Sequence, residues 1–142
     1  EKELLAKFGQ VEHIGSTAIP DLHAKPIIDI VIGISADDIK DINKYKKPFT
    51  KIGYDYMRED RPNEHLFTKG PEGNRTHYLH MIELNSLAWH EYIKFRDYLI
   101  NNPEARKRYT DLKIKLATKF ANYRKSYTAG KDKLIKEFIK NA

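Results

Sequence analysis

The residues best suited to chemistry lie near the start of the chain, in the segment His13-Ile14-Gly15-Ser16-Thr17, followed by Lys25 and Asp29. A glycine turn that carries hydroxyl groups lets backbone and side-chain donors approach an anion closely. Lys25 would add positive charge, and Asp29 could hold a divalent cation that bridges to the same phosphate. The spacing therefore predicts a phosphate site at Gly15, Ser16 and Thr17 with Asp29 beside it. The alternative is structural, with Asp29 hydrogen-bonded to a neighbouring backbone group.

Two strands would position this segment. Residues 11–14 run as a strand into the turn, and residues 26–33 are almost continuously apolar and β-branched, which is typical of a strand covered on both faces. Asp29 is the one acid in that second strand. Ser35 then predicts the N-cap of a helix that runs to about Lys46.

The rest of the chain changes from strand to helix patterns at about residue 85. The turn residues and alternation predict strands over 54–58, 65–69 and 76–84. Helix starts are predicted at Ser86, at Asn102-Pro103, and at Ser126 or Thr128. We therefore expect an α+β fold in one domain of 142 residues, with a mixed sheet and helices over 1–84 and a helical part over 85–142.

Composition narrows the class of protein. The chain is 40% hydrophobic and 11% aromatic, which is enough for a packed core. It has no cysteine, which excludes disulfides, iron–sulfur clusters and thiol nucleophiles. No apolar run is long enough to cross a bilayer, and the first residues lack a signal-peptide pattern, so we expect a cytoplasmic protein without a membrane partner.

The charge is unevenly distributed. The formal net charge is +6, with −2 on residues 1–90 and +8 on residues 91–142. A basic end can bind nucleic acid, but most of these lysines and arginines lie at helical spacing opposite apolar residues. The pattern favours a solvated helix face, and no nucleic-acid motif accompanies it.

Several separated blocks resemble one family. The stretch HIGSTAIPDLHAKPIIDI is similar to the signature of the GrpB-like family, uncharacterised proteins assigned to the nucleotidyltransferase fold. The blocks THYLHMIE and FRDYLINNPEARKRYTDLK, and the pair Tyr127 and Lys131, also resemble that family, in the same order. Together the blocks span most of the chain, so the resemblance implies a nucleotidyltransferase-like mixed sheet followed by C-terminal helices.

The resemblance implies roles for particular residues. Gly15 and Ser16 would receive nucleotide phosphates, and Asp29 would hold Mg²⁺ or Mn²⁺. The place of the usual second acid is Val31, which cannot coordinate a metal. Glu83 on the later strand does not replace it, because strand alternation puts Glu83 on the face opposite His80.

Other polar residues are candidates with open alternatives. His13 and His80, together with His77, could form a metal or phosphate cluster with Asp29, and His80 could also act as a general acid or base; the alternative is half-buried histidines bonded to backbone. Arg96 is a candidate phosphate clamp, or else a salt-bridge residue. Lys131 either reaches the same site or is solvated.

Two functions follow from these residues. In the first, the protein binds a nucleoside triphosphate with a divalent metal and transfers a nucleotidyl group to an acceptor, with Asp29 and His80 as catalytic residues. In the second, catalysis is lost and a regulatory module binds a nucleotide or a phosphorylated small molecule. Val31 supports the second hypothesis, and Val31→Asp is expected to restore activity if the protein is a degenerate enzyme.

Overall fold

A computed structural model describes residues 1–22, 25–119 and 124–142 of the chain. Five strands form one mixed sheet in the order β1-β2-β5-β4-β3. The β2–β5 pair is parallel, and the other three pairs are antiparallel. The strands are β1 (Gln10–Ile14), β2 (Ile28–Ile34), β3 (Tyr54–Arg61), β4 (Glu64–Lys69) and β5 (His77–Glu83). The predicted α+β class, with a mixed sheet followed by C-terminal helices, is confirmed.

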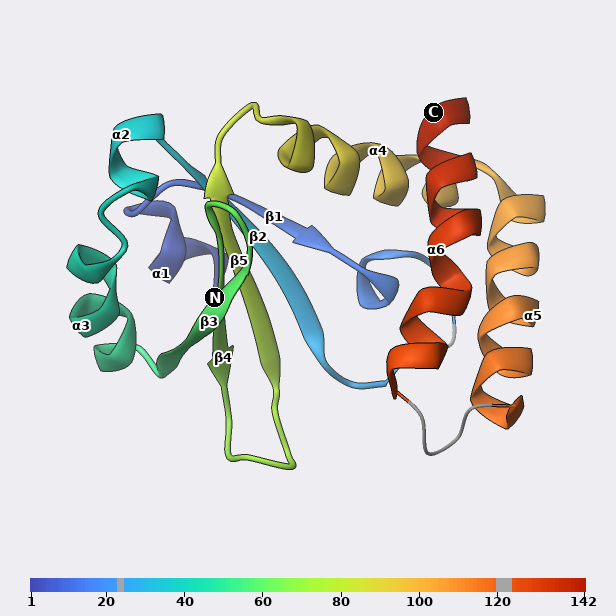
Figure 1. Cartoon of the computed structure of the whole chain (residues 1–142), viewed down its shortest axis with the longest axis horizontal. Helices are drawn as coiled ribbons and strands as arrows, with labels where there is room; N and C mark the ends of the chain where they lie inside the picture. The colour runs from blue at the N-terminus through green and yellow to red at the C-terminus, as the bar shows by residue number, and fades with distance from the viewer. Residues whose placement is uncertain (23–24, 120–123) are drawn as a thin grey trace.

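The helices lie on both sides of the sheet and beyond one end of it. Figure 1 shows α1, α2 and α3 on one side of the molecule and α5 and α6 on the other, with α4 running between them. The helices are α1 (Lys2–Ala6), the 3₁₀ turn η1 (Ser16–Ala18), α2 (Ala36–Ile39), α3 (Asn43–Lys51), α4 (Leu87–Asn101), α5 (Pro103–Lys119) and α6 (Arg124–Asn141). Within the described ranges, no helix combines the length and apolarity that crossing a membrane requires.

Three predicted elements differ from the structure. Ser35 does cap a helix, since its Oγ accepts from the backbone N–H of Asp38 at 3.1 Å, but the helix ends at Ile39 and α3 starts anew. Between the two helices, the backbone N–H of Asp41 donates to the carbonyl of Asp38, three residues earlier rather than the four of an α-helix. This tighter turn interrupts the helix. Strand β3 continues to Arg61 through two bulges. Helix α6 runs through both Ser126 and Thr128, so neither residue starts it.

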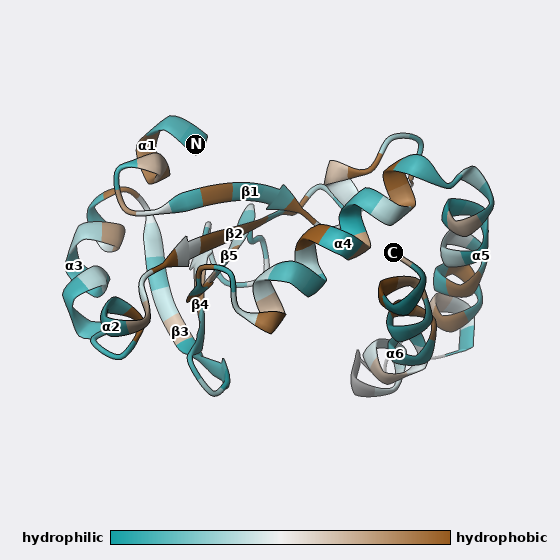
Figure 2. Ribbon diagram, turned by 90° about the horizontal axis from the view of Figure 1, so that it is seen from above, coloured by the Kyte–Doolittle hydropathy of each residue, from teal (hydrophilic) through white to brown (hydrophobic). Residues whose placement is uncertain are grey.

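Two apolar clusters cover the two faces of the sheet. On one face, α1 and α3 pack over the alternate residues of β2 that include Ile30 and Ile32. On the other face, Trp89 of α4 packs over Ile14, Val31 and Ile82. Figure 2 shows β2 coloured as hydrophobic along most of its length, as expected for a strand covered on both faces. Because side chains alternate, Asp29 lies on the α4 face, two residues before Val31.

A third apolar cluster places the C-terminal helices next to the turn after β1. Ile19, which follows η1, is buried against Leu99 of α4, Tyr109 of α5 and Phe138 of α6. This packing fixes the inner faces of α5 and α6 beside residues 15–19. Side chains from the end of the chain can therefore reach the predicted phosphate turn.

Ser86 provides a direct test of how α4 begins. Its Oγ accepts from the backbone N–H of Trp89 at 3.2 Å, which satisfies one of the free N–H groups at the helix start. We expect Ser86→Ala to lower the free energy of unfolding by about 1 kcal/mol in urea titrations, because that cap is lost. Ser126→Ala in α6 is the control, and equal stability of both variants would contradict the capping role.

Candidate functional site

The turn after β1 is in direct contact with Asp29. Ile14, the last residue of β1, pairs with Asp29 across the antiparallel ladder. Gly15 then adopts φ +73°, and a Cβ placed on it would lie 2.6 Å from Asp29 Oδ2. Only glycine allows the backbone to pass this close to the carboxylate. The structure therefore brings together Gly15, Ser16 and Asp29.

Lys113 of α5 completes this site from the far end of the chain. Its Nζ donates a hydrogen bond to Ser16 Oγ at 2.9 Å. Burial lowers the pKa of Lys113, the positive charges of Lys131 and Lys25 lower it further, and the carboxylate of Asp29 acts in the opposite direction. The charges of Lys25, Asp29 and Lys131 thus act on the ammonium group that bonds Ser16.

Two of these lysines lie over tyrosine rings. Lys113 Nζ lies 5.4 Å from the ring centroid of Tyr109, and Lys131 Nζ lies 4.6 Å from that of Tyr127. Burial raises the pKa of Tyr109 to about 12, with added contributions from Tyr127 and from the charge of Asp29. Cation–π contacts of this kind hold an ammonium group over a ring. The inner faces of α5 and α6 therefore present ordered positive charge toward the turn.

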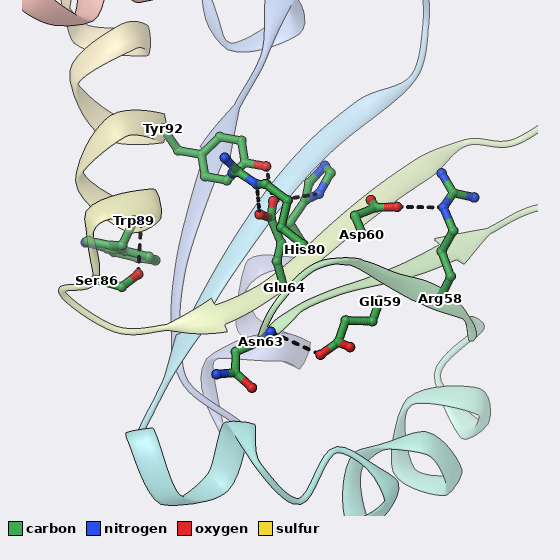
Figure 3. Close-up of polar contacts among 10 residues, drawn as sticks. Arg58, Glu59, Asp60, Asn63, Glu64, His80, Ser86, Trp89 and Tyr92 are labelled. Atoms are coloured by element: carbon green, nitrogen blue, oxygen red, sulfur yellow. Dashed lines mark hydrogen bonds and ion pairs between the residues drawn. The ribbon is translucent and has the colours of Figure 1, made fainter. Parts of the chain in front are cut away.

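His80 lies between two carboxylates. Its Nε2 is 3.9 Å from Asp29 Oδ1, and its Nδ1 is 4.0 Å from Glu64 Oε1. Glu64 is buried and accepts hydrogen bonds from the Tyr92 hydroxyl and from Arg61 Nε, the latter at 2.6 Å. Figure 3 shows Tyr92, Glu64 and His80 converging from α4, β4 and β5. The structure thus brings together Asp29 and His80, with Glu64 on the far side of the imidazole, beyond hydrogen-bond distance.

His13 and His77 do not join this group. His13 pairs with Ile30 across the ladder, which places its side chain on the face opposite Asp29, and its Nε2 lies 2.8 Å from Thr17 Oγ1. Burial lowers the pKa of His13, although the charge of Asp29 raises it. His77 lies on the α1 and α3 face, with its ring centroid 6.0 Å from that of Tyr54. The three histidines considered from sequence therefore do not form one cluster.

Arg96 braces the end of β1 against α4. Its guanidinium donates to Glu12 Oε2 at 2.8 Å, to Asp97 Oδ1 at 2.9 Å and to the His13 carbonyl at 3.2 Å. These contacts match the salt-bridge alternative for Arg96. The phosphate-clamp prediction has no such contact in its support.

The donor set does not fit a metal centre made by the protein alone. Val31, at the place of the second acid, is fully buried under Trp89. Glu83 shares its strand face with Leu79, opposite His80, as expected from alternation. In the parts of the chain that the structure describes, no group of three or more His, Asp or Glu residues could hold a metal ion. The binding of Mg²⁺ or Mn²⁺ therefore stays a prediction.

A separate cavity of about 310 Å³ lies away from the turn. It lies between the β3–β4 turn and the start of α4, and Glu64 forms part of its wall. Other polar residues that line it are Arg61, Asn63, Glu83, Ser86 and Glu91. The phosphate turn is not part of this cavity.

Sequence reasoning missed Lys113, Tyr109 and Glu64. Lys113 closes the block FRDYLINNPEARKRYTDLK, so its place in that block was a usable signal. Tyr109 is buried, and a tyrosine at helical spacing among apolar residues gives no sign that a lysine lies over its ring. Nothing in the sequence around Glu64 indicates that its carboxylate is buried beside His80.

The fold and the site define an α+β protein in which a glycine-serine turn follows the edge strand of a mixed sheet and is contacted by a lysine from a C-terminal helix. The chain belongs to the GrpB family, since the family model described as "GrpB protein" matches residues 1–141. A crystal structure of the conserved protein GrpB from Enterococcus faecalis is similar to it, with a TM-score of 0.83 and 35% identity, covering 99% of this chain and 84% of that chain.

Curated relatives agree with this assignment. The chain is 37% identical over 134 residues to the glutamate-rich protein GrpB of Alkalihalophilus pseudofirmus, covering 91% of this chain and 76% of the relative. It is 37% identical over 134 residues to the UPF0157 protein YqkA of Bacillus subtilis, covering 93% of this chain and 38% of the relative. The chain thus covers well under half of the length of this second relative, so an activity of the whole relative would come to this chain only as a proposal.

Proposed function

We propose that this chain binds a nucleotide or another phosphorylated small molecule at the turn formed by Gly15, Ser16 and Thr17. The observation that carries the proposal is the 2.9 Å hydrogen bond from Lys113 Nζ to Ser16 Oγ, with the charges of Lys25 and Lys131 acting on the same ammonium group. Ammonium groups held close together repel one another, and an anion with several oxygens relieves that repulsion. A phosphate group is such an anion.

Asp29 determines on which side a phosphate would lie. Its carboxylate touches Gly15 and attracts the Lys113 ammonium group, but it repels an anion that approaches its own side. The phosphate is therefore directed to the side of Ser16 and Lys113. The remainder of the ligand then extends past Asp29 toward His80.

Nucleotidyl transfer is the finer prediction, and we rank it second. It requires a nucleoside triphosphate, Mg²⁺ or Mn²⁺, and an acceptor. Two-metal phosphoryl transfer uses several anionic oxygens from the protein. Asp29 and His80 offer one carboxylate and one imidazole, 3.9 Å apart at their closest atoms, so binding without turnover agrees better with the residues available. The predicted cytoplasmic location stays a prediction.

Calorimetric titration of the purified chain with tripolyphosphate and with ATP, GTP, CTP and UTP tests the proposal. We expect binding in the presence and absence of Mg²⁺ or Mn²⁺. Lys113→Met should weaken tripolyphosphate binding about 30-fold, because a charged hydrogen bond to a phosphate contributes about 2 kcal/mol.

The matched control is Lys115→Met, which removes the same charge from the exposed side of the same helix. It should change the affinity less than about twofold. Equal losses of affinity in the two variants would mean that Lys113 acts only through general electrostatic attraction. Wild-type protein that binds none of these ligands would contradict the proposed site. Release of pyrophosphate from a nucleoside triphosphate would instead favour nucleotidyl transfer.

A further inference from the structure

Two buried polar atoms lack a protein hydrogen-bond partner. They are Thr68 Oγ1 on β4 and His80 Nδ1 on β5, the full set of such side-chain atoms within the described ranges. Thr68 is only 2% exposed. Burying a hydroxyl without a partner destabilises a fold, and native proteins contain few such groups. His80 Nδ1 has the Glu64 carboxylate 4.0 Å away, so the Thr68 hydroxyl is the group that requires an explanation.

Both side chains lie on the α4 face of the sheet, where His80 turns its Nε2 toward Asp29 and its Nδ1 toward Glu64. Thr68 pairs with Tyr78, and Tyr78 pairs with Asp29, so these three residues form one row across β4, β5 and β2. His80 lies two residues beyond Tyr78 on the same face. Asp29 in turn contacts Gly15. The turn, the Asp29 carboxylate, the Nε2 side of His80 and the Thr68 side chain thus lie along one face of the sheet.

Tyr78 is the partly exposed residue between Asp29 and Thr68 in this row. Helix α4 packs over β1, β2 and β5 with its core contacts at Ile14, Val31 and Ile82. Tyr78 stays partly exposed beside Asp29. The Thr68 hydroxyl is closed off from solvent, so a ligand reaches it by displacing a neighbouring side chain, and Tyr78 is its neighbour in the row. Rotamer changes of this size are common on binding.

We infer that Tyr78, Thr68 and His80, called here the Tyr78 strip, bind the hydroxyl-bearing organic part of the phosphorylated ligand. This inference rests on the proposed function. A ligand hydroxyl both donates and accepts, so it can pair with the Thr68 hydroxyl, and with His80 Nε2 in either tautomer. The ligand class is the phosphate ester of a hydroxyl-rich compound, and the shared chemistry includes the ribose of a nucleotide and a free sugar phosphate.

Pairs of ligands with and without the organic part test this inference. We compare ATP with tripolyphosphate, and ribose 5-phosphate with inorganic phosphate, by calorimetry on the whole chain. In at least one pair, the wild type should bind the organic ligand about tenfold more tightly than its inorganic counterpart. A tenfold difference in affinity corresponds to about one hydrogen bond to a buried partner. A preference in the first pair alone indicates a nucleotide, whereas a preference in both indicates a sugar phosphate.

Thr68→Val separates a binding role from a structural one. Valine keeps the shape and removes the hydroxyl, so the melting temperature of the free protein should rise by about 3 °C because an unpaired buried group is lost. The preference for the organic ligand should fall to about twofold, while tripolyphosphate binding stays unchanged. A structural hydroxyl would give the opposite result, with a lower melting temperature and an unchanged preference.

Two variants serve as controls. Thr68→Ser keeps the hydroxyl and should keep the preference. Thr76→Val, at an exposed position just before β5, removes a hydroxyl that donates to the Lys69 carbonyl at 3.3 Å, so it should not raise the melting temperature and should leave the preference unchanged. Wild-type protein that binds tripolyphosphate without any preference for the organic ligands overturns the inference and leaves the proposed function standing. Wild-type protein that binds no phosphate compound rejects both.

Discussion

Replacing Val31 with aspartate will lower the free energy of unfolding by about 4 kcal/mol and will not create a second metal ligand. Val31 is fully buried, and it packs with Ile14, Ile82 and Trp89. An aspartate there would lose its hydration beneath Trp89. Its cross-strand neighbours are Glu12 on β1, a like charge that already bonds Arg96 at 2.8 Å, and His80 on β5, whose imidazole already lies between the carboxylates of Asp29 and Glu64.

Urea titrations at several pH values measure this effect. Burial raises the pKa of the introduced carboxyl group above its unfolded value, so its protonated form is favoured in the folded state. The stability deficit of Val31→Asp should therefore be smallest at about pH 4 and should grow as the pH rises.

Val31→Asn is the control for the charge, because it introduces similar polarity and volume. Its deficit should not depend on pH over the same range. A Val31→Asp protein with wild-type stability and Mn²⁺-dependent pyrophosphate release would overturn this interpretation. It would also restore the hypothesis of a degenerate enzyme that lacks one acid.

The contact between the turn and Asp29 could be predicted from the sequence because it depends on local patterns. The β-branched run over residues 26–33 requires a strand covered on both faces, and a preceding strand at 11–14 has a short route to pair beside it. That pairing places residue 15 next to residue 29. The same run also indicates that Val31 is buried, which accounts for the missing acid without any reference to function.

The lysine at the centre of the site could not be predicted in this way. Lys113 lies 97 residues from Ser16, and the periodicity of α5 does not show which helix face meets the turn. The same holds for Arg96 and Glu12, which are 84 residues apart. Such contacts are set by the packing of Ile19 against α4, α5 and α6, a property of the whole fold. The nucleotidyltransferase-type fold and the metal also stay predictions from resemblance.

Replacing Gly15 with alanine will lower the free energy of unfolding by about 3 kcal/mol and abolish measurable phosphate binding. The new Cβ would lie 2.6 Å from Asp29 Oδ2 and 3.0 Å from Asp29 Cβ, so either the turn or the carboxylate must move. The φ of +73° adds strain for any residue with a Cβ. A displaced turn separates Ser16 from Lys113, and the site is lost even in molecules that stay folded. Urea titration and tripolyphosphate calorimetry measure the two effects.

Gly73→Ala separates the effect of backbone strain from that of the steric clash with Asp29. Gly73 has φ +81°, but no atom lies within 4 Å of a Cβ built on it, so its replacement should cost only about 1 kcal/mol. The double variant Gly15→Ala, Asp29→Ala tests the contact itself. If the carboxylate is the obstacle, the two losses will be less than additive by about 1 kcal/mol or more. Additive losses, or a Gly15→Ala variant no less stable than Gly73→Ala, would mean that the turn does not depend on its contact with Asp29.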